Sequence, residues 1–259
     1  MAIVRRVLPP LVALLLVLGV WEVLVRALGV ATYLLPPPSE IAGAGFHDRA
    51  ALGSAMLVTA TSALIGFALS TVFGIMGGLL LASSRLLERA LYPYALFLQT
   101  VPIVAIAPLL VLWFGAGWKA VAVSAFIVSV FPVVANTLAG VRGVEPALRD
   151  LFRLHRASRA ATLWKLELPA ALPQIVTGLR VAAGLAVIGA IVGEFVAGFS
   201  EGAAGLGITV LSAYRQLRTD LLFAAVFSAA VLGLMLFAVI NWTGQRLLRR
   251  WHASAKEAS

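Results

Sequence analysis

Six long apolar stretches constrain the fold of this chain more than any other feature. They cover residues 7–28, 56–82, 91–114, 120–141, 173–197 and 221–242. As helices rising about 1.5 Å per residue, each is long enough to cross a hydrocarbon layer of about 30 Å. Because 61% of the 259 residues are apolar and only 12% are charged, a soluble fold would leave too much apolar surface in water. The sequence predicts an all-α membrane protein with six transmembrane helices in a single domain, residues 1–259.

Two of the stretches need separate interpretation. The first follows Arg5 and Arg6, as the apolar region of a secretory signal peptide would. It is long enough to span and no clear small-x-small cleavage site follows it, so we predict a retained first helix. The third stretch contains or adjoins Pro93, Pro102 and Pro108. Because proline lacks a backbone donor, we expect this helix to be kinked or broken.

Basic residues predict the orientation in the membrane. With the N-terminus in the cytoplasm, 14 Lys and Arg lie on the cytoplasmic side of the stretches and 5 on the other side, with Arg180 inside a span. Cytoplasmic loops of membrane proteins carry such an excess. We therefore expect a multi-pass protein of the bacterial-type inner membrane with both termini in the cytoplasm. Anionic lipid also accounts for the net charge of +9 without nucleic acid as a partner.

The chain lacks the residue clusters that enzymes and metal sites need. It has no cysteine, and His47, His155 and His252 lie far apart in sequence. No nucleophile, base and orienting group can be assembled from its scattered acids and histidines. No phosphate-binding Gly-x-x-x-x-Gly-Lys-[Ser/Thr] loop is present. We expect no catalytic centre and no metal or cofactor bound by this chain.

One connection, residues 142–172, is longer than a simple loop between spans. Apolar residues recur in it partly at helical spacing and alternate with charged ones, so we predict short amphipathic helices under the membrane, ending before Pro169. Such helices either dock on a partner protein or lie at the lipid headgroups. The apolar positions are Leu148, Leu151, Phe152, Leu154, Ala157, Ala161, Leu163 and Trp164.

The same connection carries a spaced motif. Asp150-Leu151-Phe152 is followed after three residues by Arg156, and after nine more by Leu166-Glu167-Leu168-Pro169. This resembles the EAA loop of ABC importer permeases, which reads Glu-Ala-Ala, three residues, Gly, nine residues, Ile, any residue, Leu-Pro. Asp150, Arg156 and Leu166 replace its Glu, Gly and Ile. Residues 34–40, 107–115 and 205–207 also resemble permeases of the nitrate/sulfonate/taurine type, so the resemblance covers nearly the whole chain.

The resemblance implies a type I ABC importer permease fold whose EAA-type coupling helices seat on a separate ATPase subunit. It implies two permease copies as a homodimer, two ATPase subunits that bind ATP and Mg, and a periplasmic or lipid-anchored substrate-binding protein. Because Arg156 bends less easily than the family's Gly, we expect the local turn or the subunit contact to differ. A polar contact from Arg156 to the ATPase is one compensation. The coupling residues carried over are Asp150, Leu151, Phe152, Arg153, Arg156, Ala157, Ser158, Leu163, Leu166, Leu168 and Pro169.

Polar residues inside the spans are the candidates for the translocation pathway, because polar groups are costly in lipid. Each has a structural alternative: Gln99 and Thr100 satisfy a helix break, Asn136 and Thr137 join helices, and Arg180 and Glu194 bind a neighbouring backbone or reach an interface. The candidates are Gln99, Thr100, Asn136, Thr137, Arg180 and Glu194.

The resemblance leaves the transported solute open. Related permeases carry nitrate, bicarbonate, sulfonates or taurine, which favours a small anion. Others carry thiamine-type pyrimidine precursors or riboflavin, and residues 99–107 look more like those members. A secondary transporter is the alternative from another class. It predicts internal repeats, none of which is convincing here, and it leaves the EAA-like loop unexplained.

Overall fold

The computed structural model describes residues 2–197 and 204–248, with side chains from residue 8 onward. This part of the chain is helical and contains no strand. The helices long and apolar enough to span a membrane are Leu8–Ala27 in α1 (Ala2–Ala27), α3 (Arg49–Ser83), α6 (Trp118–Arg142), Arg159–Ala197 and α11 (Thr219–Leu248). A bent pair, α4 (Arg85–Thr100) and α5 (Ile103–Phe114), brings the total to six if it crosses as one unit.

The bent pair confirms the predicted break in the third stretch. Its two helices meet at 96° across Val101 and Pro102. Val101 is extended, with φ −71° and ψ 123°, because a following proline disfavours the helical conformation. Pro93 and Pro108 lie inside α4 and α5 without ending either helix. The break therefore belongs to Pro102 alone.

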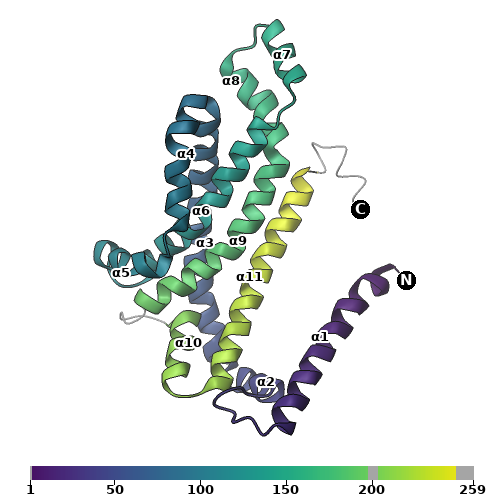
Figure 1. Cartoon of the computed structure of the whole chain (residues 1–259), viewed down its shortest axis with the longest axis vertical. Helices are drawn as coiled ribbons and strands as arrows, with labels where there is room; N and C mark the ends of the chain where they lie inside the picture. Colours follow the sequence, from purple (N-terminus) through teal and green to yellow (C-terminus); the bar gives the residue numbers. More distant parts are fainter. Residues whose placement is uncertain (1, 198–203, 249–259) are drawn as a thin grey trace.

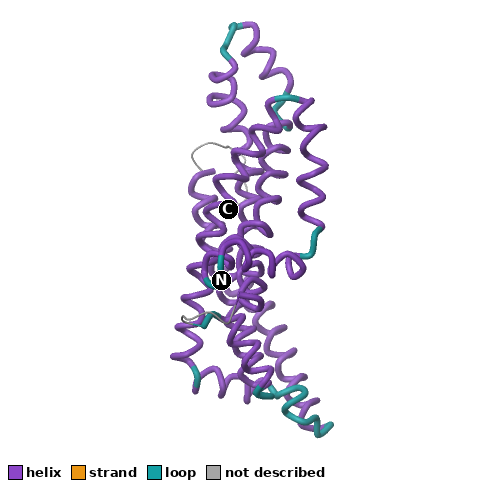
Figure 2. Tube along the Cα trace, turned by 90° about the vertical axis from the view of Figure 1, so that its left-hand side faces the viewer, coloured by secondary structure: helices purple, strands orange, loops and turns teal. Residues whose placement is uncertain are grey.

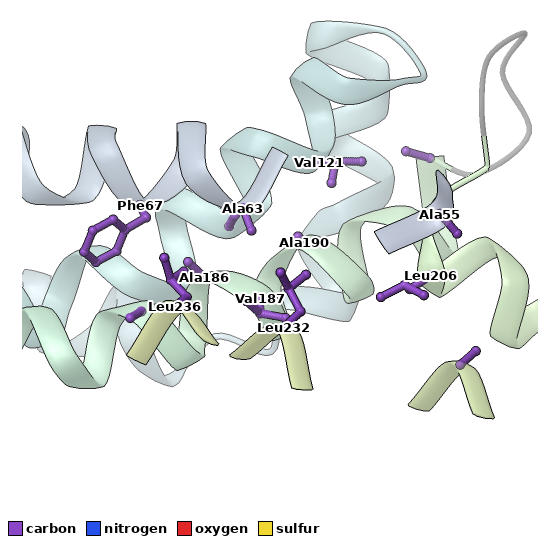
Figure 3. Close-up of a cluster of buried hydrophobic side chains, with 14 of the residues drawn as sticks. Ala55, Ala63, Phe67, Val121, Ala186, Val187, Ala190, Leu206, Leu232 and Leu236 are labelled. Atoms are coloured by element: carbon purple, nitrogen blue, oxygen red, sulfur yellow. The ribbon is translucent and has the colours of Figure 1, made fainter. Parts of the chain in front are cut away.

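The core lies where α3, α6 and α9 (Leu168–Ala197) meet. Ala125 of α6 is fully buried between the other two helices. A Cβ on Gly66 of α3 would stand 2.5 Å from the Cβ of Ala125, and one on Gly189 of α9 would stand 2.8 Å from its Cα. Only glycine allows this approach, which is how small residues let helices pack in lipid. Figure 3 shows the adjoining cluster with Ala63, Phe67, Ala186, Val187 and Ala190.

Helix α1 stands apart from this bundle (Figure 1). Only 6% of its most apolar window is buried within the chain. It is tied to α2 (Pro38–His47) through Glu22, which accepts hydrogen bonds from Ser39 N at 3.0 Å and Ser39 Oγ at 2.8 Å. Arg26 Nη2 also donates to Ser39 Oγ at 3.0 Å. The first helix is thus anchored at one end and leaves most of its apolar surface for lipid or another subunit.

The long connection folds into α7 (Pro146–Leu154), α8 (Arg159–Thr162) and a π-helical turn, η1 (Leu163–Glu167). The prediction that these helices end before Pro169 is wrong, because α8, η1 and α9 form one continuous helix, Arg159–Ala197. Pro169 has no N–H for the helical hydrogen-bond ladder. The wider π turn just before it, closed by Leu168 N to Leu163 O, lets the helix continue. The remaining helix, α10 (Leu206–Arg215), packs between α9 and α11.

Candidate functional site

The leucine face of α7, formed by Leu148, Leu151 and Leu154, is an exposed apolar surface in the connection between α6 and α9. These side chains are 42%, 48% and 81% exposed. No residue of α7 is buried, and the helix stands beyond the ends of the bundle helices (Figures 1 and 2). Leucine side chains are rarely left in water without a partner surface when they gather on one face. This face is therefore available to another molecule.

The other predicted residues of α7 flank the leucine face. Asp150 and Arg153 are exposed and pair with each other at 3.2 Å. Phe152, one of the predicted coupling residues, is only half-exposed, so part of its ring packs within the chain. Leu154 presents more free surface than Phe152 to a partner.

Arg156 occupies the left-handed conformation at the end of α7, with φ 51°. Ala157 N donates to Phe152 O and Arg156 N donates to Arg153 O, each at 2.9 Å. These two bonds form the helix-ending Schellman motif in which glycine is usual. The expected change in the turn is therefore not seen: Arg156 makes the bend that glycine would make. Its side chain is exposed, and the expected polar contact with the ATPase stays a prediction.

The remaining coupling residues connect the loop to the bundle. Ser158 begins α8, where its Oγ accepts a hydrogen bond from Ala161 N at 3.2 Å. Leu168 packs against a small buried cluster shared with α3 and α6. The half-buried positions at this junction are Ala157, Leu163, Leu166, Leu168 and Pro169. Part of their surface is thus used within the chain, and their contact with an ATPase stays a prediction.

Glu167, which sequence reasoning did not select, is a buried charged residue of the loop at 2% exposed. Its Oε1 lies 3.3 Å from Arg149 Nε and 3.4 Å from Arg159 Nη1. Arg159 thus turns toward this carboxylate, although its side chain is 62% exposed. The available signal was an acid beside Leu168-Pro169 in a connection where Lys and Arg outnumber the acids. Its burial depends on side chains 8 and 18 residues earlier, which spacing alone does not reveal.

Glu194 lies near the other end of the same long helix. Its Oε1 accepts from Thr59 Oγ1 at 2.8 Å and its Oε2 from Gly207 N at 2.7 Å. Leu206 N in turn donates to Thr59 Oγ1 at 2.8 Å. A carboxylate and a hydroxyl from α9 and α3 thus cap the free N–H groups at the start of α10. This is the backbone-binding alternative considered for Glu194, and a pathway role stays a prediction.

The other polar candidates are distributed over α4, α6 and α9. Gln99 and Thr100 are exposed at the α4–α5 break, where Thr100 Oγ1 donates to Phe97 O at 2.7 Å. Asn136 Nδ2 donates to Pro132 O at 2.8 Å. Thr137 is fully buried against Gly78 of α3, as expected of a residue that joins helices. These contacts match the structural alternatives, and none of them tests passage of a solute.

Arg180 differs from these residues. It lies in the interior of α9 and is half-buried. Its Nε is buried and has no hydrogen-bond partner among the described residues. Among the same residues, no group of three or more His, Asp or Glu is placed to hold a metal ion. Among the candidate pathway residues, Thr137 also has a buried atom, Oγ1, without a hydrogen-bond partner in the described part of the chain, and Arg180 is the one that carries a positive charge.

Comparison with known proteins connects these features. Residues 70–252 match the family described as "Binding-protein-dependent transport system inner membrane component". The chain is 37% identical to the formylaminopyrimidine transport permease protein ThiX of Halalkalibacterium halodurans, covering 91% of this chain and 93% of ThiX. It is 36% identical to the riboflavin transport system permease protein RibX of Chloroflexus aurantiacus, covering 94% and 90%. It is 30% identical to the taurine transport system permease protein TauC of Escherichia coli, covering 97% and 92%.

A solved structure supports the fold. The MetNI methionine ABC transporter in an inward-facing conformation superposes with a TM-score of 0.63 at 20% identity, covering 78% of this chain and 96% of the matched chain. This likeness confirms the predicted type I importer permease architecture. The chain belongs to the family of binding-protein-dependent transport system inner-membrane components and is a permease of an ABC importer.

Proposed function

We propose that α7 is the coupling helix by which this permease docks on a separate ATPase subunit. The observation that carries the proposal is the exposed leucine face of α7 beyond the bundle. Helix-in-groove recognition needs such an apolar face with charged residues around it. The pair Asp150–Arg153 and the exposed Arg156 supply those charges. A helix that only rested on lipid would not need to extend past the ends of the spans.

The proposal includes an assembly and a direction. Two copies of this chain form the pore as a homodimer. Two ATPase subunits, which bind ATP and Mg, dock at the α7 end. A periplasmic or lipid-anchored binding protein delivers the solute at the α10 end. The excess of Lys and Arg at the α7 end supports a cytoplasmic location for that end and for both termini. Closure of the ATPase pair moves the two coupling loops and switches access to the pathway.

Copurification tests the docking surface. The permease is coexpressed with its candidate ATPase as wild type, as Leu151→Asp and as Leu34→Asp, which changes an equally apolar exposed residue at the opposite end. We expect Leu151→Asp to weaken ATPase binding by about thirtyfold, since a buried interface anchor contributes about 2 kcal/mol. Leu34→Asp should copurify as the wild type does. Equal recovery of all three complexes would contradict docking through α7.

We infer that the solute is a small anion, with Arg180 lining its path. A half-buried guanidinium inside α9 with a partnerless Nε favours a passing sulfonate or carboxylate. The taurine system relative supports this class. The second candidate is a heteroaromatic vitamin precursor, favoured by the higher identities to ThiX and RibX.

Uptake by cells that express the complete transporter separates the two classes. Labelled taurine and labelled riboflavin are offered to the wild type and to Arg180→Gln. An anion carrier takes up taurine, and Arg180→Gln reduces that uptake. Riboflavin uptake that is insensitive to Arg180→Gln would establish the second candidate and remove Arg180 from the pathway.

A further inference from the structure

The ionic cluster of Glu167, Arg149 and Arg159 lies at the base of the coupling loop, away from the leucine face. Glu167 is 2% exposed, whereas the side chains of Arg149 and Arg159 are 24% and 62% exposed. Both cations approach the same oxygen, Oε1, at 3.3 and 3.4 Å. The carboxylate comes from η1, and the two guanidinium groups come from α7 and α8. One buried charge thus joins all three segments of the loop.

Both arginines also reach the bundle. Arg149 Nη2 donates to Val141 O in the last turn of α6. Arg159 Nη2 donates to Ser83 O, at the C-terminus of α3, at 3.4 Å. Helix C-termini carry free carbonyl groups and a partial negative charge, which favour a cation. Because η1 continues directly into α9, the cluster connects α7 to the ends of α3, α6 and α9.

A buried carboxylate makes this connection stiff. Removing a charge from water is costly unless a counter-charge is kept close, so Glu167 cannot separate from both arginines without a large penalty. A displacement of α7 therefore moves Arg149, then Glu167, and with it the start of α9. A loop held by apolar contacts alone could slide by small steps instead.

We propose that Glu167 is a positioning residue that transmits movement of the coupling helix to the membrane-spanning bundle. It does not touch the ATPase or the solute. It couples the position of α7 to the ends of α3, α6 and α9, the three helices that form the core. This inference rests on the proposed docking of α7, but it concerns a different surface and a different property: coupling efficiency rather than assembly.

The test measures solute transported per ATP hydrolysed by the complete transporter in proteoliposomes. Glu167→Gln keeps the shape of the side chain and removes its charge. We expect the ATPase to remain bound, hydrolysis to stay within about twofold of wild type and transport per ATP to fall about tenfold, a size typical of altered coupling networks. Glu167→Asp, which keeps the charge, should restore part of the loss.

A matched control and a structural readout separate transmission from general damage. Arg89→Gln makes the same kind of change at an exposed site on α4, at the same end of the molecule, and should leave coupling unchanged. The chain has no cysteine, so spin labels at Asp150→Cys and Leu86→Cys can report the position of α7 in the permease alone. Glu167→Gln should broaden the distribution of distances between the two spin labels, and Arg89→Gln should not.

The outcomes are distinguishable. If the wild-type chain binds no ATPase, the proposed function fails. If the ATPase binds and Glu167→Gln couples as well as wild type, the proposed function stands and this inference is wrong. Should Glu167→Gln not be recovered as folded protein, Arg159→Gln decides, because its side chain is mostly exposed. A loss of about threefold or more in transport per ATP supports the inference, and wild-type coupling overturns it.

Discussion

Two buried glutamates lie near opposite ends of one continuous helix, Arg159–Ala197, and they are held in different ways. Glu167 and Glu194 are each 2% exposed. Glu167 is held by two long cationic side chains from the coupling loop. Glu194 is held by the Thr59 hydroxyl and the Gly207 amide, both from helices of the bundle. The α7 end is thus built from flexible charged groups, and the α10 end from short groups with fixed positions.

The difference predicts that the two ends of the helix respond differently to substitution. Two ion pairs hold Glu167 to α7 and α8, so we expect α7 and the start of α9 to shift together. At the α10 end, a backbone amide and a β-branched hydroxyl hold Glu194 in a fixed position. We therefore expect the stability of the α10 end to be most sensitive to changes of shape, and the α7 end to be sensitive to the loss of charge, in stability as well as in coupling.

The largest expected effect is that of Gly207→Ala at the α10 end. A Cβ there would lie 2.6 Å from Ile191 O and 2.9 Å from Glu194 Cβ, so the α9 backbone would have to move. We expect a loss of about 3 kcal/mol in the free energy of unfolding, as for overpacked cores. Thermal unfolding of the purified chain, followed by tryptophan fluorescence, measures it. Gly233→Ala in α11, where no atom lies within 4 Å of the added Cβ, is the control. Equal melting temperatures for the two variants would contradict a tight contact between α9 and the start of α10.

A paired substitution of the two glutamates compares their surroundings directly. Glu167→Gln leaves two cations without a counter-charge and should cost about 2 kcal/mol of stability, less than a fully buried pair because Arg159 is largely exposed. Glu194→Gln keeps an acceptor oxygen for neutral donors and should cost about 1 kcal/mol or less. The same unfolding measurement in parallel gives the difference. A larger loss of stability for Glu194→Gln than for Glu167→Gln would mean that charge, rather than hydrogen bonding, holds the α10 end.

Thr59→Val tests the bridge at the α10 end alone. The substitution keeps the branched shape but removes the acceptor of Leu206 N and the donor to Glu194. We expect a loss of about 1 kcal/mol, as for removal of a helix cap, together with faster hydrogen exchange at the start of α10. An unchanged exchange rate there would show that α10 is held by packing.

The smallest expected effect is a gain in stability at the end of α7. Arg156 holds a left-handed conformation that costs an L residue about 1 kcal/mol relative to glycine. Arg156→Gly should therefore stabilise the end of α7 by up to about 1 kcal/mol. The backbone amides at positions 156 and 157 should then exchange hydrogen more slowly than in the wild type. If Arg156 also contacts the ATPase, the same variant binds it more weakly. Faster exchange in the variant would contradict the strain argument.

Much of the fold follows from local sequence signals. Apolar length located the spans and Pro102 located the break. Motif spacing selected the connection between α6 and α9 as the candidate coupling loop. Features that depend on distant side chains were not accessible. Glu167 is buried by arginines from two other segments, and Glu194 meets α10 after a 13-residue separation. The left-handed turn at Arg156 runs against its residue type, so only the backbone hydrogen bonds reveal it.

The continuity of α8, η1 and α9 has a consequence for rotational phase. Each residue of a helix turns the chain by about 100°, so removing or adding one residue between 159 and 168 would rotate the coupling loop around the axis of the spanning helix. The leucine face of α7 would then point away from its partner although every one of its residues is retained. In loop exchanges between permeases, the number of residues in this stretch should matter more than their identity.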